Sequence, residues 1–158
     1  MEPDGAADRP RQHRRQPSAR RAVERVRNSP HEDRRQDEGA PSADDVIAGY
    51  RQLIARAHAR SIRIIGATLT PFQDALHDTP FNNYYDEDKE KKRQAVNTWI
   101  RSSGAFDGVI DFDAATRDPS NPKHILAKYD SGDHLHPQDV GYKAMADSID
   151  LNLLGGGR

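Results

Sequence analysis

Two side chains near the C-terminus, Asp133 and His136, have the types and the spacing of an acid–base pair. A carboxylate three residues before a histidine can accept a hydrogen bond from one imidazole nitrogen and so fix the tautomer of the ring. The other nitrogen is then free to take a proton from a hydroxyl nucleophile. We therefore expect the two side chains to lie within hydrogen-bonding distance, with His136 near the loop that follows Thr70-Pro71.

The residues after this pair predict how it is positioned. Pro137 suits the first position of a helix, so His136 is expected at the helix N-terminus, where the dipole favours a neutral imidazole. The alternative is that the pair only caps this helix. Five apolar residues at helical spacing are predicted to face inward from it: Val140, Ala144, Met145, Ile149 and Leu153.

Histidine spacing also suggests a metal site. His134 and His136 alternate in a predicted loop, so their side chains can share a face. Asp133 or His124 would complete a set of ligands suited to zinc. Because the following Pro-helix context already accounts for His136, the acid–base interpretation is favoured.

The remaining candidates are assigned to loops or to the surface. Asp111 and Asp113 are either paired carboxylates or, the favoured interpretation, polar loop residues at a strand end. His58 and His77 lie among polar residues and are predicted to be solvated. Three aromatic residues would either line an acyl or sugar pocket or pack their own loop: Phe81, Tyr84 and Tyr85.

The elements that must position these residues alternate between helices and strands. Periodic apolar residues predict helices over 43–60 and about 87–102, and β-branched runs predict strands over 62–69 and 108–112. Residues 113–136 are predicted to be mostly loop. Such alternation implies parallel strands joined by right-handed crossovers, an α/β fold. Two strands are too few for a stable parallel sheet, so the sequence is interpreted as the C-terminal part of a doubly wound domain.

The stretch Gly132-Asp133-His134-Leu135-His136-Pro137, with Gly141 and Tyr142, resembles the last motif of the SGNH hydrolases, also called GDSL-type lipases and esterases. The resemblance covers about residues 44–154. It implies a three-layer, flavodoxin-like fold and hydrolysis of a carboxylic ester through a serine acyl-enzyme. In that mechanism His136 is the general base and then the general acid, Asp133 orients it, and no metal or organic cofactor takes part. Upstream, three stretches are similar to elements of the family: 62–72, 95–100 and 106–112.

Three features of the family are absent from the sequence. No Gly-Asp-Ser block supplies the serine nucleophile, and neither the oxyanion-hole glycine nor the Gly-x-Asn-Asp block is found before the strand predicted over 62–69. Loss of the nucleophile abolishes covalent catalysis, and oxyanion donors contribute roughly 10²–10³ each. The chain is therefore expected to be a truncated and inactive form of the hydrolase. The alternative is a non-catalytic binding or interaction module.

Residues 1–42 differ from the rest of the chain in composition. They hold ten arginines and eight acidic residues, with no lysine and no aromatic residue. Such a segment buries too little apolar area to offset its ordering entropy, so a disordered tail is predicted, followed by a partial esterase-type domain over 43–158. Two alternatives stay open: a basic arm for RNA, and off-frame translation of GC-rich DNA.

The composition of all 158 residues excludes several classes of function. Hydrophobic residues make up 34% and no cysteine is present, which excludes disulfides, a thiol nucleophile and zinc–thiolate sites. The net charge of -1 gives no attraction to nucleic acid. No apolar run is long enough for a membrane span, and no signal peptide is recognised. The expected partner is a small-molecule ester, while localisation and oligomeric state are not assigned.

Overall fold

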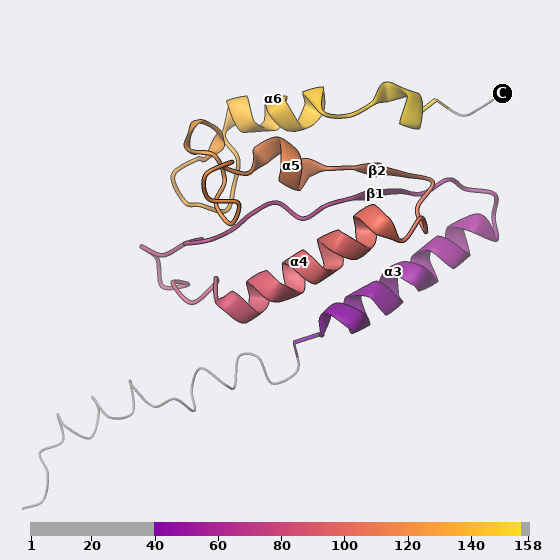
Figure 1. Cartoon of the computed structure of the whole chain (residues 1–158), viewed down its shortest axis with the longest axis horizontal. Coiled ribbons are helices and arrows are strands. Elements are labelled where there is room, and N and C mark those ends of the chain that lie inside the picture. Colours follow the sequence, from indigo (N-terminus) through magenta and orange to yellow (C-terminus); the bar gives the residue numbers. More distant parts are fainter. Residues whose placement is uncertain (1–39, 156–158) are drawn as a thin grey trace, which may run out of the picture. The chain divides into compact units, whose positions relative to one another are not determined.

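The computed structural model describes residues 40–155, so the tail predicted over 1–42 lies outside them apart from its last three residues. The described part is an α/β fold, as predicted (Figure 1). Its main elements, in chain order, are α3 (Ala43–His58), β1 (Ile65–Ala67), α4 (Glu87–Ser102), β2 (Gly108–Ile110), α5 (Phe112–Thr116), the 3-10 helix η1 (Ala127–Tyr129), α6 (Asp139–Asp147) and the 3-10 helix η2 (Leu151–Leu153).

The two long helices begin at their predicted residues, and each start is capped by a side chain. At α3, the Asp45 backbone N–H donates to the Ser42 hydroxyl at 3.1 Å and the Ser42 N–H donates to the Asp45 carboxylate at 2.9 Å, a complete capping box. At α4, Asp86 accepts a hydrogen bond from the Lys89 N–H at 2.7 Å. These contacts satisfy amide groups that the first turn of a helix leaves without partners. Helix α3 ends at His58, two residues before its predicted end.

The two strands pair in parallel, as predicted, but each is shorter than the sequence indicates. At both ends of β1, a side chain accepts the backbone N–H group that a neighbouring strand would otherwise bind. The Ile64 N–H donates to Asp107 and the Leu69 N–H donates to Asn97, each at 2.7 Å. Within residues 40–155, β1 has no strand on its other edge. The paired residues are Ile65 with Gly108, Gly66 with Val109, and Ala67 with Ile110.

The apolar core lies between α3, α4 and the start of β2. Helices α3 and α4 run side by side next to the strands (Figure 1), and Ile47, Val96 and Ile100 form the buried centre. Tyr50 and Trp99 stack at its margin with ring centroids 6.2 Å apart. Four apolar residues of α4 recur at helical spacing. Val96, Trp99 and Ile100 are buried or half-buried, and Ala95 is exposed.

Helix α4 also buries polar residues that its apolar pattern does not reveal. The Arg93 side chain is 3% exposed, and its guanidinium donates to Glu90 at 2.7 and 2.8 Å, to Asp113 at 2.6 Å and to the Leu69 carbonyl at 3.0 Å. Asn97 is fully buried and pairs with both backbone groups of Leu69, at 2.7 and 2.8 Å. Helix α4 thus fixes the chain where it leaves β1 and enters the following loop.

The segment after β2 departs from the predicted loop. Asp111 caps the short helix α5 by accepting from the Ala114 N–H at 3.0 Å, and Asp113 within that helix is buried beside Arg93 rather than being a loop residue. In α6, Val140 is 53% exposed and not inward, because Gly141 is the residue of that turn that packs against the preceding loop. None of the helices within 40–155 has the length and apolar character needed to cross a bilayer.

Candidate active site

The predicted hydrogen bond between Asp133 and His136 is present. His136 Nδ1 lies 2.6 Å from Asp133 Oδ2, while Asp133 Oδ1 accepts the backbone N–H groups of Leu135 at 3.0 Å and His136 at 2.8 Å. A carboxylate next to Nδ1 requires that nitrogen to carry the proton, which leaves the lone pair on Nε2. The His136 side chain is 61% exposed, so this second nitrogen is accessible to a reacting group.

The same contacts keep Asp133 ionised. Partial burial raises the pKa of the Asp133 carboxyl, but hydrogen bonds from the His136 side chain and from the backbone of His136 and Leu135 outweigh burial and hold it well below its usual range. The Ser131 hydroxyl adds a further hydrogen bond at 3.0 Å. At neutral pH the imidazole of His136 is therefore oriented by a carboxylate anion.

The backbone geometry explains why two positions of the motif are glycine. Gly132, directly before Asp133, has a φ of +100°, a conformation that side chains rarely adopt. Gly141 brings α6 so close to the preceding loop that a Cβ atom there would lie 2.6 Å from the Tyr129 carbonyl oxygen and 2.8 Å from Pro137. Glycine is therefore favoured at 132 by the backbone conformation and at 141 by the close packing of α6 against the loop.

The predicted start of the last helix is wrong by two residues. Helix α6 begins at Asp139 with Gln138 as its N-cap, so His136 precedes the helix. The reason is a short antiparallel bridge between Asp130 and Pro137, together with a hydrogen bond from the Gln138 N–H to the Tyr129 carbonyl at 2.8 Å, which holds this stretch extended. Because no side chain caps α6, the alternative that the pair only caps the helix is also wrong.

The pair lies next to the loop that follows β1, as predicted. The Leu76 N–H donates to the Asp133 carbonyl at 2.9 Å, and the ring of His77 stacks on that of His134 with centroids 5.1 Å apart. Since α4 fixes this loop at its start through Leu69, the position of Asp133 depends on α4 as well as on its own loop.

Comparison with known proteins assigns the family. The family model for GDSL-like lipases and acylhydrolases matches residues 5–144. The chain belongs to the GDSL-like lipase/acylhydrolase family. No curated protein matches the chain.

Two solved structures show the same fold as this family member. A GDSL-like lipase from Bacteroides thetaiotaomicron VPI-5482 matches with a TM-score of 0.59 and 18% identity, over 77% of this chain and 57% of its own. A protein of Bacteroides fragilis NCTC 9343 assigned to the acylhydrolases matches with a TM-score of 0.56 and 18% identity, over 73% of this chain and 53% of its own. The GDSL-like chain thus spans little more than half the length of each.

Residues 40–155 do not provide His136 with a serine partner. The hydroxyl of Ser131, on the same loop, donates to Asp133 and not to the imidazole. Within the described part of this GDSL-like chain, no serine hydroxyl is hydrogen-bonded to the His136 ring.

The metal hypothesis is not supported by the arrangement of its residues. His134 is held by Asp130, and His124 Nε2 lies 3.2 Å from Asp74, so each ring is engaged by its own carboxylate. Across residues 40–155, no three His, Asp or Glu side chains converge as metal ligands would.

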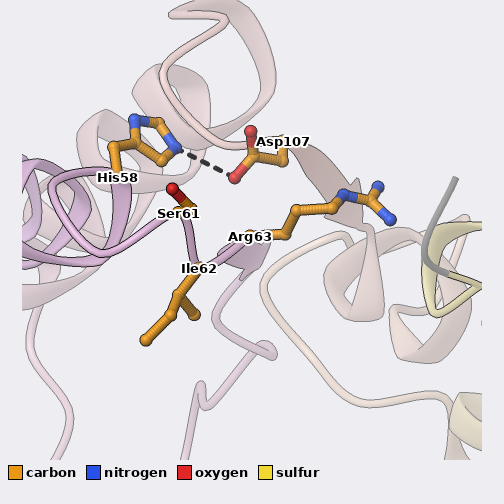
Figure 2. Close-up of a pocket in the computed structure, with 5 residues that line it drawn as sticks. All are labelled: His58, Ser61, Ile62, Arg63 and Asp107. Atoms are coloured by element: carbon orange, nitrogen blue, oxygen red, sulfur yellow. Dashed lines mark hydrogen bonds and ion pairs between the residues drawn. The ribbon is translucent and has the colours of Figure 1, made fainter. Parts of the chain in front are cut away.

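A second His–Asp pair lies where the two strands begin, at the ends opposite the loop after β1. His58 Nε2 is 2.9 Å from Asp107, and the pair lines an open hollow of about 320 Å³ with Ser61, Ile62 and Arg63 (Figure 2). Asp107 also accepts the Ile64 N–H, and no hydrogen bond joins the Ser61 hydroxyl to His58 in this described region. The pair therefore ties the turn after α3 to the turn before β2. The polar residues around His58 predict a solvated side chain and give no sign of Asp107, because the two residues are 49 positions apart.

The aromatic residues of the loop before α4 pack against one another in part. Phe72 meets Tyr84 and Tyr85 edge to face, with ring centroids 6.2 and 5.2 Å apart. Burial and a hydrogen bond to Glu87 raise the pKa of Tyr85 above its usual value. Phe81 is 66% exposed. The packing interpretation thus applies to the two tyrosines and not to Phe81.

Proposed function

We propose that this chain supplies the acid–base part of a serine ester hydrolase. His136 takes the proton of a serine hydroxyl as general base and returns it to the leaving alcohol as general acid, while Asp133 orients the ring and stabilises the imidazolium. The substrate class is a carboxylic ester, cleaved through an acyl-enzyme. The observation that carries this proposal is the 2.6 Å contact of Asp133 with His136 Nδ1, which leaves Nε2 as an accessible base.

The nucleophile must come from a part of the fold outside residues 40–155. The sequence has no Gly-Asp-Ser block, and the chain spans 57% and 53% of the two similar structures. A general base without a nucleophile and oxyanion donors lacks the groups that carry most of the rate enhancement. We therefore expect no ester hydrolysis by the 158-residue chain alone.

The test combines an assay with complementation. The full chain, shown to be folded by circular dichroism, is assayed with a chromogenic short-chain ester and with a fluorophosphonate probe, and we expect neither turnover nor labelling. The N-terminal portion of a GDSL-like hydrolase, carrying its Gly-Asp-Ser block, is then added as a separate polypeptide. A recovered rate that His136→Ala abolishes and that His58→Ala, at the opposite ends of the strands, leaves unchanged supports the proposal. Turnover by the chain alone that survives His136→Ala contradicts it.

A non-catalytic interaction role is the second candidate. It is favoured by the unpaired edge of β1 within the described residues and by an adjoining hollow of about 170 Å³. The side chains lining it are mainly apolar and include Tyr50, Leu53 and Phe106. The occupant that suits a free parallel edge is a strand from the N-terminal portion of a family member, since the similar structures contain more chain than this one covers. Binding of that portion without any recovered ester hydrolysis would favour this role.

A further inference from the structure

Asp133 stands between two residues with unusual backbone conformations. Gly132 before it has a φ of +100° and His134 after it has a φ of +59°. Positive φ is permissive for glycine but costly for a residue with a Cβ atom, so His134 needs contacts that hold it there. This double reversal allows the chain to turn from Asp133 to His136 and to present Nδ1 to the carboxylate.

One carboxylate holds both unusual residues. Asp130 Oδ1 accepts the backbone N–H of Gly132 at 2.8 Å and that of His134 at 3.0 Å. The other oxygen, Oδ2, contacts Nδ1 of the His134 ring. The Asp130 side chain is only 7% exposed, so these three contacts take the place of water around a buried charge.

The ring of His134 is in turn enclosed by residues from other segments. His77 stacks on it at 5.1 Å, and His124 meets it edge to face at 6.1 Å. The same loop that carries His77 donates the Leu76 N–H to the Asp133 carbonyl. The His134 side chain is therefore held by residues outside the turn as well as by Asp130.

We infer that Asp130, acting through the backbone of Gly132 and His134, is the positioning residue that sets the geometry of the Asp133–His136 pair. The inference rests on the proposed function of that pair as orienting carboxylate and general base. Asp130 does not touch the reacting atoms. It fixes the turn on both sides of Asp133, and thereby the tautomer of the base, so that the pair is formed before any substrate binds.

The test reads the tautomer of His136 directly. The full chain is labelled with ¹⁵N in its histidines, and the ring nitrogen shifts are recorded at a pH where the imidazoles are neutral. In the wild-type chain we expect His136 to carry its proton on Nδ1. Asp130→Ala should return His136 to the tautomer mixture of a short unstructured peptide. The matched control is Asp78→Ala, which removes an exposed partner of His77 in the neighbouring loop and should leave His136 unchanged.

A second variant keeps the inference testable if Asp130→Ala fails to fold. Asp130→Asn retains one oxygen for the two backbone N–H groups but presents an NH₂ donor to Nδ1 of His134. We expect His134 to move its proton to Nε2 in this variant, while His136 keeps the Nδ1 proton. A folded Asp130→Ala chain with an unchanged His136 tautomer would overturn the inference. So would an Asp130→Asn chain in which His134 and His136 both change, or neither does.

Failure of this inference is distinguishable from failure of the proposed function. The tautomer measurement needs no turnover, so it can succeed even if complementation yields no esterase. In a complemented enzyme, Asp130→Ala is expected to lower kcat with little change in KM, because the orientation of the base changes and the ester-binding surface does not. Recovered hydrolysis with a His136 tautomer that is insensitive to Asp130→Ala would retain the proposed function and reject the positioning role.

Discussion

The surroundings of Arg93 and the loop around Asp133 are built from the same materials, carboxylates facing nitrogen donors, but differ in what they leave open. Arg93, Glu90 and Asp113 have side chains only 2–3% exposed, and each guanidinium nitrogen has an acceptor. In the loop, Asp133 also has its oxygens occupied, but the imidazole it orients is 61% exposed with one nitrogen outward. The first arrangement holds elements together, and the second leaves the imidazole that we propose as the general base open to solvent.

Burial determines whether each group of charges affects the stability of the fold or the chemistry of the site. A buried charge without a partner is expensive, so the Arg93 cluster is stable only when complete. An exposed imidazole loses little when its partner is removed, because water solvates it. Mutations in the cluster should therefore change stability, whereas mutations of the acid–base pair should change chemistry.

The largest effect is expected at Arg93. Arg93→Met leaves Glu90 as a buried carboxylate without its cation and removes one of the three arginines that contact Asp113, which keeps Arg101 and Arg117. It should lower the free energy of unfolding by about 3–5 kcal/mol in urea titrations. The matched control is Lys91→Met on the same helix, whose ion pair with Asp88 is exposed and should contribute less than about 1 kcal/mol. Equal losses in the two variants would contradict the contrast between closed and open clusters.

The next effect concerns the contact of α6 with the loop. Gly141→Ala places a methyl group 2.6 Å from the Tyr129 carbonyl oxygen, and should cost about 1–3 kcal/mol of unfolding free energy. Gly49→Ala in α3 is the control, because no atom lies within 4 Å of its added methyl and alanine favours a helix by up to about 1 kcal/mol. The two substitutions should therefore shift the thermal midpoint in opposite directions, and a shared direction would argue against the close packing.

A smaller loss of stability is expected when the pH is lowered. The hydrogen bond with Arg101 is the main cause that lowers the pKa of Asp111 from 3.8 to about 2. Since the folded pKa lies below the unfolded value, the stabilisation is complete above pH 3.8 and is lost as pH falls towards 2. For a side chain 36% exposed, solvent screening limits it to below about 2 kcal/mol.

Urea titrations of the wild type and Asp111→Asn check this dependence. The variant should be less stable at neutral pH, and the gap should close as pH falls below 3.8. A gap that stays constant down to pH 2 would show that the charge of Asp111 does not stabilise the fold.

The smallest change in stability is expected at His136. With its side chain 61% exposed, His136→Ala should alter the unfolding free energy by less than about 0.5 kcal/mol. The measurement is the same urea titration used for Arg93→Met. A loss comparable to that of Arg93→Met would place His136 among the residues that hold the fold together.

The sequence predicts those parts of the fold that depend on local signals. The starts of α3 and α4 are predicted by apolar periodicity, and the caps at Ser42 and Asp86 act within three residues. The strands are shorter than predicted because Asp107 and Asn97 accept backbone N–H groups that would otherwise bond to a neighbouring strand. No local sequence pattern predicts that these side chains do so. Apolar periodicity likewise overlooks Arg93, because it counts only apolar residues as buried.

The same distinction applies to the candidate site. The contact of Asp133 with His136 is predictable, since they are three positions apart and the turn brings them together. The position of His136 before the helix is not, because the bridge of Asp130 with Pro137 decides it. The role of Asp130 depends on the backbone conformations of Gly132 and His134, and a positive φ at a histidine leaves no trace in composition or spacing.

The loop over 130–136 has a consequence for how its shape arises during folding. Its side-chain hydrogen bonds join residues two to four positions apart, so each closes a very short length of chain. Short closures have a small entropic cost and form quickly, whereas Arg93 reaches Leu69 and Asp113 across 24 and 20 positions, so these contacts must await the docking of α4. The turn can therefore close locally before it docks on the loop that carries Leu76 and His77, whereas the Arg93 cluster forms only once its separate segments have met.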